Sequence, residues 1–215
     1  MKKTSWMKVT GLVMIAGAIF ASTLFLCPLV LAANDDLPTI NPSNVPNNVS
    51  ITFDKSNPTD SVNTKMVINA PDKTVMDFSS FNISKSYTVY VVLPNLNNGQ
   101  LASFLARDLS GNASYINGTL NCNGLFVLTN TSGINIGDTG RINSQALILS
   151  TRDITNTNFV NGNYIFEKSI ASQTDRLLLN RGTITISQGG FGVLIAGAIE
   201  NQGVIVCPMG TIALA

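Results

Sequence analysis

The 215-residue sequence contains no histidine, only three cysteines and a single tryptophan. Without histidine the chain lacks the commonest general base and metal ligand of proteins, so a Ser-His-Asp or Cys-His catalytic arrangement is impossible. Cysteines in this number, without histidine, give no zinc set. The acids that hydrolysis would need stand isolated along the sequence, at Asp108, Asp138, Asp153 and Asp175. We therefore predict no catalytic residue, no metal site and no cofactor, and a protein that is not an enzyme.

Charge is also scarce. Charged residues make up 12% of the chain, about half of the usual share. The formal net charge of +1 becomes −2 when Lys2, Lys3 and Lys8 of the N-terminal segment are left out. No basic stripe remains, which argues against nucleic acid as a partner. Apolar residues reach 45%, enough for a sizeable core.

Two cysteines, Cys122 and Cys207, lie beyond the N-terminal segment. In an oxidising compartment they could form a disulfide. Alternatively, both are small buried hydrophobic residues within strands. The second interpretation is favoured, because a separation of 85 residues gives no local geometric reason for a bond.

Residues 1–33 are typical of a secretory signal peptide. Three lysines precede an uncharged apolar stretch at residues 11–32, and small residues at its end allow cleavage after Ala32 or Ala33. An uncleaved membrane anchor is the alternative, since 22 apolar residues could span a bilayer. Pro28 and the small-residue exit favour cleavage. Cys27 follows Leu26, where a lipoprotein signal would need a small residue, so we expect no lipidation.

After the signal, residues 34–60 form a lead-in rich in Pro and Asn, with a short strand or cap expected at residues 50–53. A succession of short apolar runs begins at residue 61, and Tyr87-Thr-Val-Tyr-Val-Val92 is the strongest strand signal. Residues 96–109 have a weak helical period, and residues 151–160 are expected to be a connecting loop with a short turn. Asn occurs 25 times, and with Gly, Ser and Thr it favours turns.

A pattern of a polar residue, any residue, Gly, any residue and Ile returns in the second half of the chain. It occurs around Gly140, Gly182 and Gly203, with Asn161-Gly162 lying 20 residues before Gly182. A second echo, Gly190-Phe-Gly-Val-Leu194 and Gly210-Thr-Ile-Ala-Leu214, has a similar step. Such a period indicates stacked units that share one core. We predict an all-β fold, a right-handed parallel β-helix (β-solenoid) with N-terminal cap strands and small extra-helical elements, over residues 61–215. Because the chain ends within an apolar strand, we expect it to be a fragment of a larger exoprotein.

Several segments, in order, resemble the filamentous haemagglutinin N-terminal family, also called the haemagglutination activity or two-partner secretion domain. The resemblance spans residues 49–215. Three stretches carry it: MVINAPDKTVMDFSSFNIS from Met66, RDLSGNASYINGTLNCNGLFVL from Arg107 and INSQALILSTRDITNTNFVNGNYIF from Ile142. The matching positions include Phe81, Asn82, Ile83, Arg107, Gly111, Gly118 and, within the repeat, Gly182 and Gly203.

One departure concerns the family's Asn-Pro-Asn-Gly turn, whose first Asn is tied to recognition by the outer-membrane partner. Here the turn reads Asn130-Thr131-Ser132-Gly133. Pro would preset the backbone of the turn, whereas Thr does not. The resemblance therefore implies that these four residues are the candidate site for transporter recognition, on a turn with a looser backbone.

The resemblance implies the secretion domain of a large exported surface protein, such as an adhesin. Its partners would be the general export machinery and an outer-membrane β-barrel transporter, with a host or neighbouring cell reached through downstream regions. It would act at the surface of a bacterium with two membranes, after passing the periplasm. Two alternatives from other classes stay open: a carbohydrate-binding or carbohydrate-active β-solenoid, and a structural surface fibre without a transporter.

Overall fold

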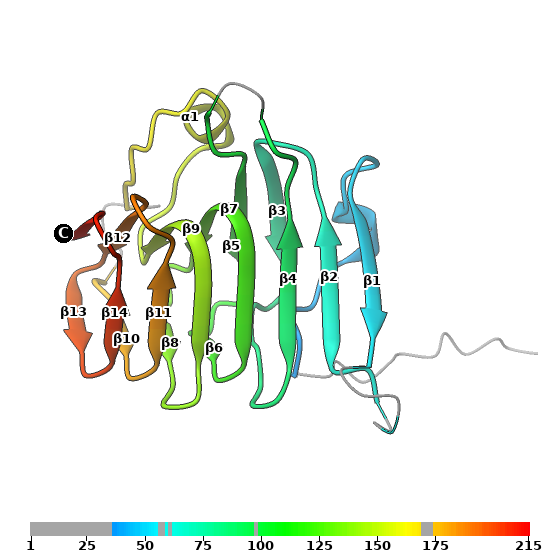
Figure 1. Cartoon of the computed structure of the whole chain (residues 1–215), viewed down its shortest axis with the longest axis horizontal. Helices are drawn as coiled ribbons and strands as arrows, with labels where there is room; N and C mark the ends of the chain where they lie inside the picture. Colours follow the sequence, from blue (N-terminus) through cyan, green and yellow to red (C-terminus); the bar gives the residue numbers. More distant parts are fainter. Residues whose placement is uncertain (1–35, 56–58, 60–61, 97–98, 169–173) are drawn as a thin grey trace, which may run out of the picture. The chain divides into compact units, whose positions relative to one another are not determined.

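A computed structural model describes residues 36–55, 59, 62–96, 99–168 and 174–215 of the chain. The predicted signal peptide, residues 1–33, lies outside these residues. Almost all of the regular secondary structure in the described residues is β-strand (Figure 1). Within this part of the chain, none of the helices has the length and hydropathy that crossing a bilayer demands.

Fifteen strands and two short helices are described in chain order within these ranges. They are η1 (Pro42–Asn44), β1 (Ser50–Asp54), β2 (Lys65–Asn69), β3 (Thr74–Phe78), β4 (Thr88–Val92), β5 (Ser103–Asp108), β6 (Ser114–Ile116), β7 (Thr119–Thr129), β8 (Ile134–Ile136), β9 (Arg141–Ser150), α1 (Asn156–Val160), β10 (Leu177–Asn180), β11 (Thr183–Ile186), β12 (Phe191–Ile195), β13 (Ala198–Asn201), β14 (Val204–Val206) and β15 (Thr211–Leu214).

The strands stack as a β-helix with three faces, and all pairs except β1 with β2 are parallel. The first face contains β1, β2, β4, the first halves of β7 and β9, β11 and β14. The second face contains β3, β5, the second halves of β7 and β9, β12 and β15. The third face contains β6, β8, β10 and β13. One turn through the faces is a rung, and β2, β4, β7, β9, β11 and β14 begin rungs one to six.

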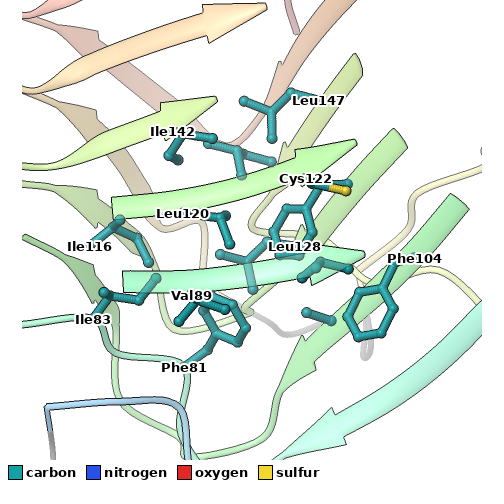
Figure 2. Close-up of a cluster of buried hydrophobic side chains, with 14 of the residues drawn as sticks. Phe81, Ile83, Val89, Phe104, Ile116, Leu120, Cys122, Leu128, Ile142 and Leu147 are labelled. Carbon is teal, nitrogen blue, oxygen red and sulfur yellow. The ribbon is translucent and has the colours of Figure 1, made fainter. Parts of the chain in front are cut away.

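The interior is filled by columns of apolar side chains that run from rung to rung. On the first face, Met66, Val89, Leu120 and Ile142 lie in register, and each is 0% exposed. On the second face, the rings of Phe104 and Phe126 stack with centroids 6.1 Å apart. Figure 2 shows labelled side chains from all three faces gathered between the strands. Each such buried side chain contributes about 1.5–3 kcal/mol, so stacking itself stabilises the fold.

The repeated glycines occupy the corner that leads from the third face to the first. A Cβ added at Gly182 would lie 2.3 Å from the carbonyl oxygen of Gly140, and one at Gly203 would lie 2.2 Å from that of Gly182. Only glycine allows backbone to approach backbone this closely. The predicted repeat is therefore confirmed at these three positions. Gly162 does not belong to it, because it follows α1 with φ +74°.

An N-terminal cap covers the first rung. β1 pairs antiparallel to β2, and Leu37, Ile40, Val45 and Val49 pack against the core cluster that includes rung one. The expected cap strand thus lies within the Pro-rich lead-in.

One local expectation is wrong, and another is incomplete. Residues 96–109 were expected to have a helical period, yet residues 103–108 form β5. The period is misleading because both sides of β5 are buried, so apolar residues are not confined to alternate positions. The expected loop at residues 151–160 contains α1, whose N-terminus is capped by the side chain of Thr155.

The register also decides the cysteine question. Cys122 pairs with Ser144, Ser144 pairs with Ile186, and Cys207 follows the residue that pairs with Thr185. The two cysteines therefore lie about three strand spacings apart, roughly 14 Å, well beyond the reach of a disulfide. Both are free thiols. Cys122 is buried within β7, as expected, whereas Cys207 is only half-buried and follows the end of β14, so the expectation is wrong for Cys207.

Candidate functional site

The predicted recognition turn lies at the corner where β7 leaves the second face. The backbone N–H of Ser132 donates to Asn130 Oδ1 over 2.7 Å, and the N–H of Gly133 donates to the Asn130 carbonyl over 3.1 Å. Gly133 has φ +122°, a region that favours glycine. The side chain of Asn130 thus forms the turn that Asn residues commonly make, and Thr131 stands in the place of Pro without opening it.

The side chain of Asn130 points inward and is 1% exposed. Its Nδ2 donates to Asp108 Oδ2 at 3.0 Å, to the Asn112 carbonyl at 2.9 Å and to Ser114 Oγ at 2.8 Å. All three acceptors belong to the preceding rung. Asn130 therefore joins rung three to rung two through a buried polar contact, and its amide is fully engaged in the folded domain.

The carboxylate of Asp108 is the centre of this buried network. It accepts hydrogen bonds from the backbone N–H groups of Phe81 and Ser110, each at 2.9 Å, and from Ser114 Oγ at 2.5 Å. Together with Asn130, these donors satisfy a charge that burial would otherwise penalise. Sequence reasoning counted Asp108 only among scattered acids. The missed signal is its position at the end of a strand, directly before the polar stretch at residues 110–114.

The segment containing Phe81, Asn82 and Ile83 forms the third face of rung one. Ile83 makes a parallel bridge to Ile116, and Asn82 Oδ1 accepts from the Tyr115 N–H at 2.8 Å. Phe81 is 0% exposed and contacts Phe78 edge-on, with ring centroids 4.9 Å apart. These motif residues therefore hold the end of rung one onto rung two, although only Ile83 joins a β-bridge.

Arg107 lies on the opposite side of the strand from Asp108. Its Nη1 donates to Asp77 at 2.7 Å, its Nε to Asp153 at 2.9 Å, and its Nη2 to the Ile154 carbonyl at 2.8 Å and to Asn156 at 2.9 Å. Burial opposes its positive charge, but the bonds and attraction from Asp153 and Asp77 outweigh burial and raise the pKa of Arg107. It is the polar centre of a contact between the solenoid and residues 151–168.

The remaining predicted residues are glycines, which allow backbone conformations or close backbone contacts that other residues would not. Gly111 sits in a turn with φ +74°, and a Cβ at Gly118 would lie 2.4 Å from the carbonyl oxygens of Ser84 and Tyr87. Gly182 and Gly203 lie at the other corner, away from the recognition turn. The structure thus joins residues 130–133 to Phe81 through Asp108, but it does not join them to the glycine repeat.

Nothing in the described part of the chain forms a group of three or more His, Cys, Asp or Glu residues able to hold a metal ion. The site is a set of buried hydrogen bonds between rungs.

Comparison with known proteins decides the family. The model of the TPS secretion domain matches residues 39–215. The chain belongs to the TPS secretion domain family. The expected resemblance to two-partner secretion domains is therefore confirmed, and so is the expected β-helix.

Two relatives illustrate this membership. The HMW1 secretion domain from Haemophilus influenzae has a solved structure that superposes with a TM-score of 0.62 at 28% identity, over 73% of this chain and 41% of that chain. A heme/hemopexin-binding protein, also from Haemophilus influenzae, is 32% identical over 111 residues. That match covers 52% of this chain and 11% of the relative, so this chain corresponds to a small part of that protein. As a member of this family, the chain contains a secretion domain of the two-partner type.

Proposed function

We propose that residues 130–133 are a recognition element for an outer-membrane transporter, and that the transporter binds this turn before the domain folds. The supporting observation is the burial of Asn130, which is 1% exposed with its amide bonded to the preceding rung. An extended chain presents this side chain freely, whereas the folded domain hides it. Folding would therefore end recognition.

The stacking of each rung on the one before it gives secretion a direction. Each rung that forms outside the cell buries apolar side chains against the rung before it, which disfavours return of the chain. While the chain is still extended, its strands can pair with an edge of the transporter's periplasmic part. Closure of the Asp108 network on Asn130 then marks the third rung as folded.

The test is secretion of the intact exoprotein carrying either Asn130→Ala or Ser114→Ala. Both changes remove a member of the same buried network, and each should lower stability by about 1–3 kcal/mol. Only Asn130→Ala alters the turn. We expect Asn130→Ala to lower secretion well below the level of Ser114→Ala. Because Asn130 is buried, its substitution also disturbs the folded solenoid, so the matched Ser114→Ala variant is needed as a control. Equal secretion of the two variants would remove the turn from recognition.

The route belongs to the same proposal. The general export machinery would act on residues 1–33, the chain would cross the periplasm, and a β-barrel transporter would pass it to the cell surface as part of an adhesin-like exoprotein. A gene for such a barrel beside the gene for this chain would support the route, and its absence would favour a surface fibre.

One observation favours a second candidate, binding of a neutral sugar chain. A groove of about 460 Å³ crosses four rungs on the outside of the first face, and none of the described residues that line it is charged. Tyr90, Asn121, Asn143 and Gln145 offer hydroxyl and amide groups there, which suit sugar hydroxyls. With no Asp or Glu in the lining, the groove favours binding over hydrolysis. Titration with neutral oligosaccharides, compared with an Asn143→Ala variant, tests this candidate.

A further inference from the structure

The outside of the second face is apolar, unlike an exterior that meets water. Val75, Leu105, Val127 and Ile148 lie in register on four successive rungs. Leu105 and Val127 are each 0% exposed, although their side chains point away from the solenoid core and belong to a separate apolar cluster. Something must cover this column.

The cover is supplied by residues 151–168, which we call the strap. It follows β9 and includes α1, seen beside the strands in Figure 1. Ile154 and Phe159, which are 2% and 1% exposed, pack into the cluster, and Phe166 joins them. A pair of hydrogen bonds between the backbones of Asp153 and Glu167, at 3.0 and 2.9 Å, closes the strap into a loop at its base.

Polar anchors tie the strap to the early rungs. Arg107 on rung two joins Asp77 on rung one to Asp153 and Asn156 of the strap. Thr129 on rung three donates to Asp153 over 3.3 Å. Further along the strap, burial raises the pKa of Tyr164, with the Asp72 carboxylate adding to the effect. The strap thus reaches back from rung four to rungs one, two and three.

The position of the strap implies an order of folding, in which the rungs stack before the strap docks. The strap's docking surface is made of side chains from rungs one to four, and Val193 of rung five continues the same column. This surface does not exist until the rungs have stacked. The strap itself follows the strands of rungs one to four in the sequence and precedes β12. Its contacts therefore depend on the earlier rungs, whereas the rungs can pair strand by strand without it.

We propose that the strap is a latch, which docks only after rungs one to four have stacked and then holds them as one cooperative unit. Rungs that stack only on their neighbours can open from an end, one at a time. With the latch docked, opening rung two or three requires the release of Arg107, Phe159 and their partners as well. The latch thus slows unfolding of the N-terminal half.

Phe159→Ala tests the latch on the purified chain, with Val160→Ala as the control. These neighbours lie in the same helix, but Val160 is 41% exposed and Phe159 is buried. We expect Phe159→Ala to speed hydrogen exchange of β5 and of the second half of β7 by roughly tenfold or more, because the lost contacts form late. Val160→Ala should leave both unchanged. Phe159→Leu keeps the fold testable should the alanine variant be too unstable.

Faster exchange in the strap alone, with β5 and β7 unchanged, would overturn the proposal and make the strap a passive cover. Pulse-labelled refolding gives an independent check, since the amides of Asp153 and Glu167 should become protected after those of β5 and β7. Protection in the reverse order would also overturn it. No transporter takes part in either measurement, so the outcome is separate from that of the recognition turn.

Discussion

The first and second faces of this solenoid share β7 and β9 but have opposite exteriors. β7 runs through both, with Asn121 facing outward on the first face and Val127 facing outward on the second. Asn121 is partly exposed and lies in register with Tyr90 and Asn143, whereas Val127 is fully buried beneath the strap. The interior columns are apolar on both faces. What distinguishes the faces is therefore the outward residues, which leave one face open to ligands and require a cover on the other.

The difference lies within single strands. In β7, buried and partly exposed residues alternate up to Asn123 and then give way to continuous burial. The pairing register of β7 with β9 shifts between Cys122 and Leu125, where the strand bends from one face to the next. A solenoid of this kind thus changes the use of its surface at a corner, without changing its core.

The largest expected difference between the two faces appears when the same charge is introduced on the outside of each. Val127→Asp would bury a carboxylate without a partner beneath the strap, and we expect it to lower stability by more than about 4 kcal/mol. Asn121→Asp places the same group on the open face, and we expect a change within about 0.5 kcal/mol. Chemical unfolding followed by circular dichroism measures both. Similar losses for the two variants would mean that the faces do not differ as described.

A second test removes the polar anchor but keeps the apolar cover. Arg107→Met loses four hydrogen bonds and leaves Asp77 and Asp153 without their cation. Since both carboxylates are about one third exposed, water can solvate them in part, and we expect a loss of about 2 kcal/mol. Arg141→Met, on the exposed start of β9, is the matched control with little expected effect. Equal unfolding midpoints for the two variants would show that the strap depends on apolar contacts alone.

The core of the fold could be predicted from the sequence because its signals are local. The Gly140, Gly182 and Gly203 period reports a corner where backbones touch, and short β-branched runs report strands. Small extra-helical elements were expected, but the helix of the strap and its docking site were not predicted, for a physical reason. The strap's helix has five residues, too few to show a period, and its stability comes from Phe159 and Arg107 meeting side chains that are distant in sequence.

A signal for a cover was nevertheless present. Leu125-Phe-Val-Leu128 is an uninterrupted apolar run, which is typical of a strand buried on both sides. In an open β-helix the outward residues Leu125 and Val127 would be polar. The candidate site was predicted only in part, because the role of Asp108 depends on Asn130, Ser114 and Phe81 meeting at one corner, and no spacing along the chain indicates that meeting.

Cys122 lies at the bend of β7, in the interior that both faces share, and the ionisation of its thiol can be used to probe that interior. Burial raises the pKa of the Cys122 thiol to about 12. The unfolded thiol ionises near pH 9, while the folded one stays protonated, so Cys122 leaves stability unaffected at neutral pH and lowers it as pH rises from about 9 towards 12. At pH 10 the loss is about 1 kcal/mol. Comparing unfolding midpoints of the native chain and of Cys122→Ala from pH 8 to pH 10 separates the effect of Cys122 ionisation on stability from the effects of tyrosine and lysine ionisation. Parallel pH profiles would mean that the bend admits water to the core.

The smallest expected effect concerns the open face itself. Asn143 Nδ2 donates to Asn121 Oδ1 over 3.0 Å, in a part-exposed position that water can also reach. Because water replaces a lost hydrogen bond there, Asn143→Ala should change stability by no more than about 0.5 kcal/mol. Thermal unfolding with the Asn121→Ala and double variants gives the coupling between the two amides. A coupling above about 1 kcal/mol would show that the amides stabilise the solenoid, and it would weaken the case that the open face is reserved for a ligand.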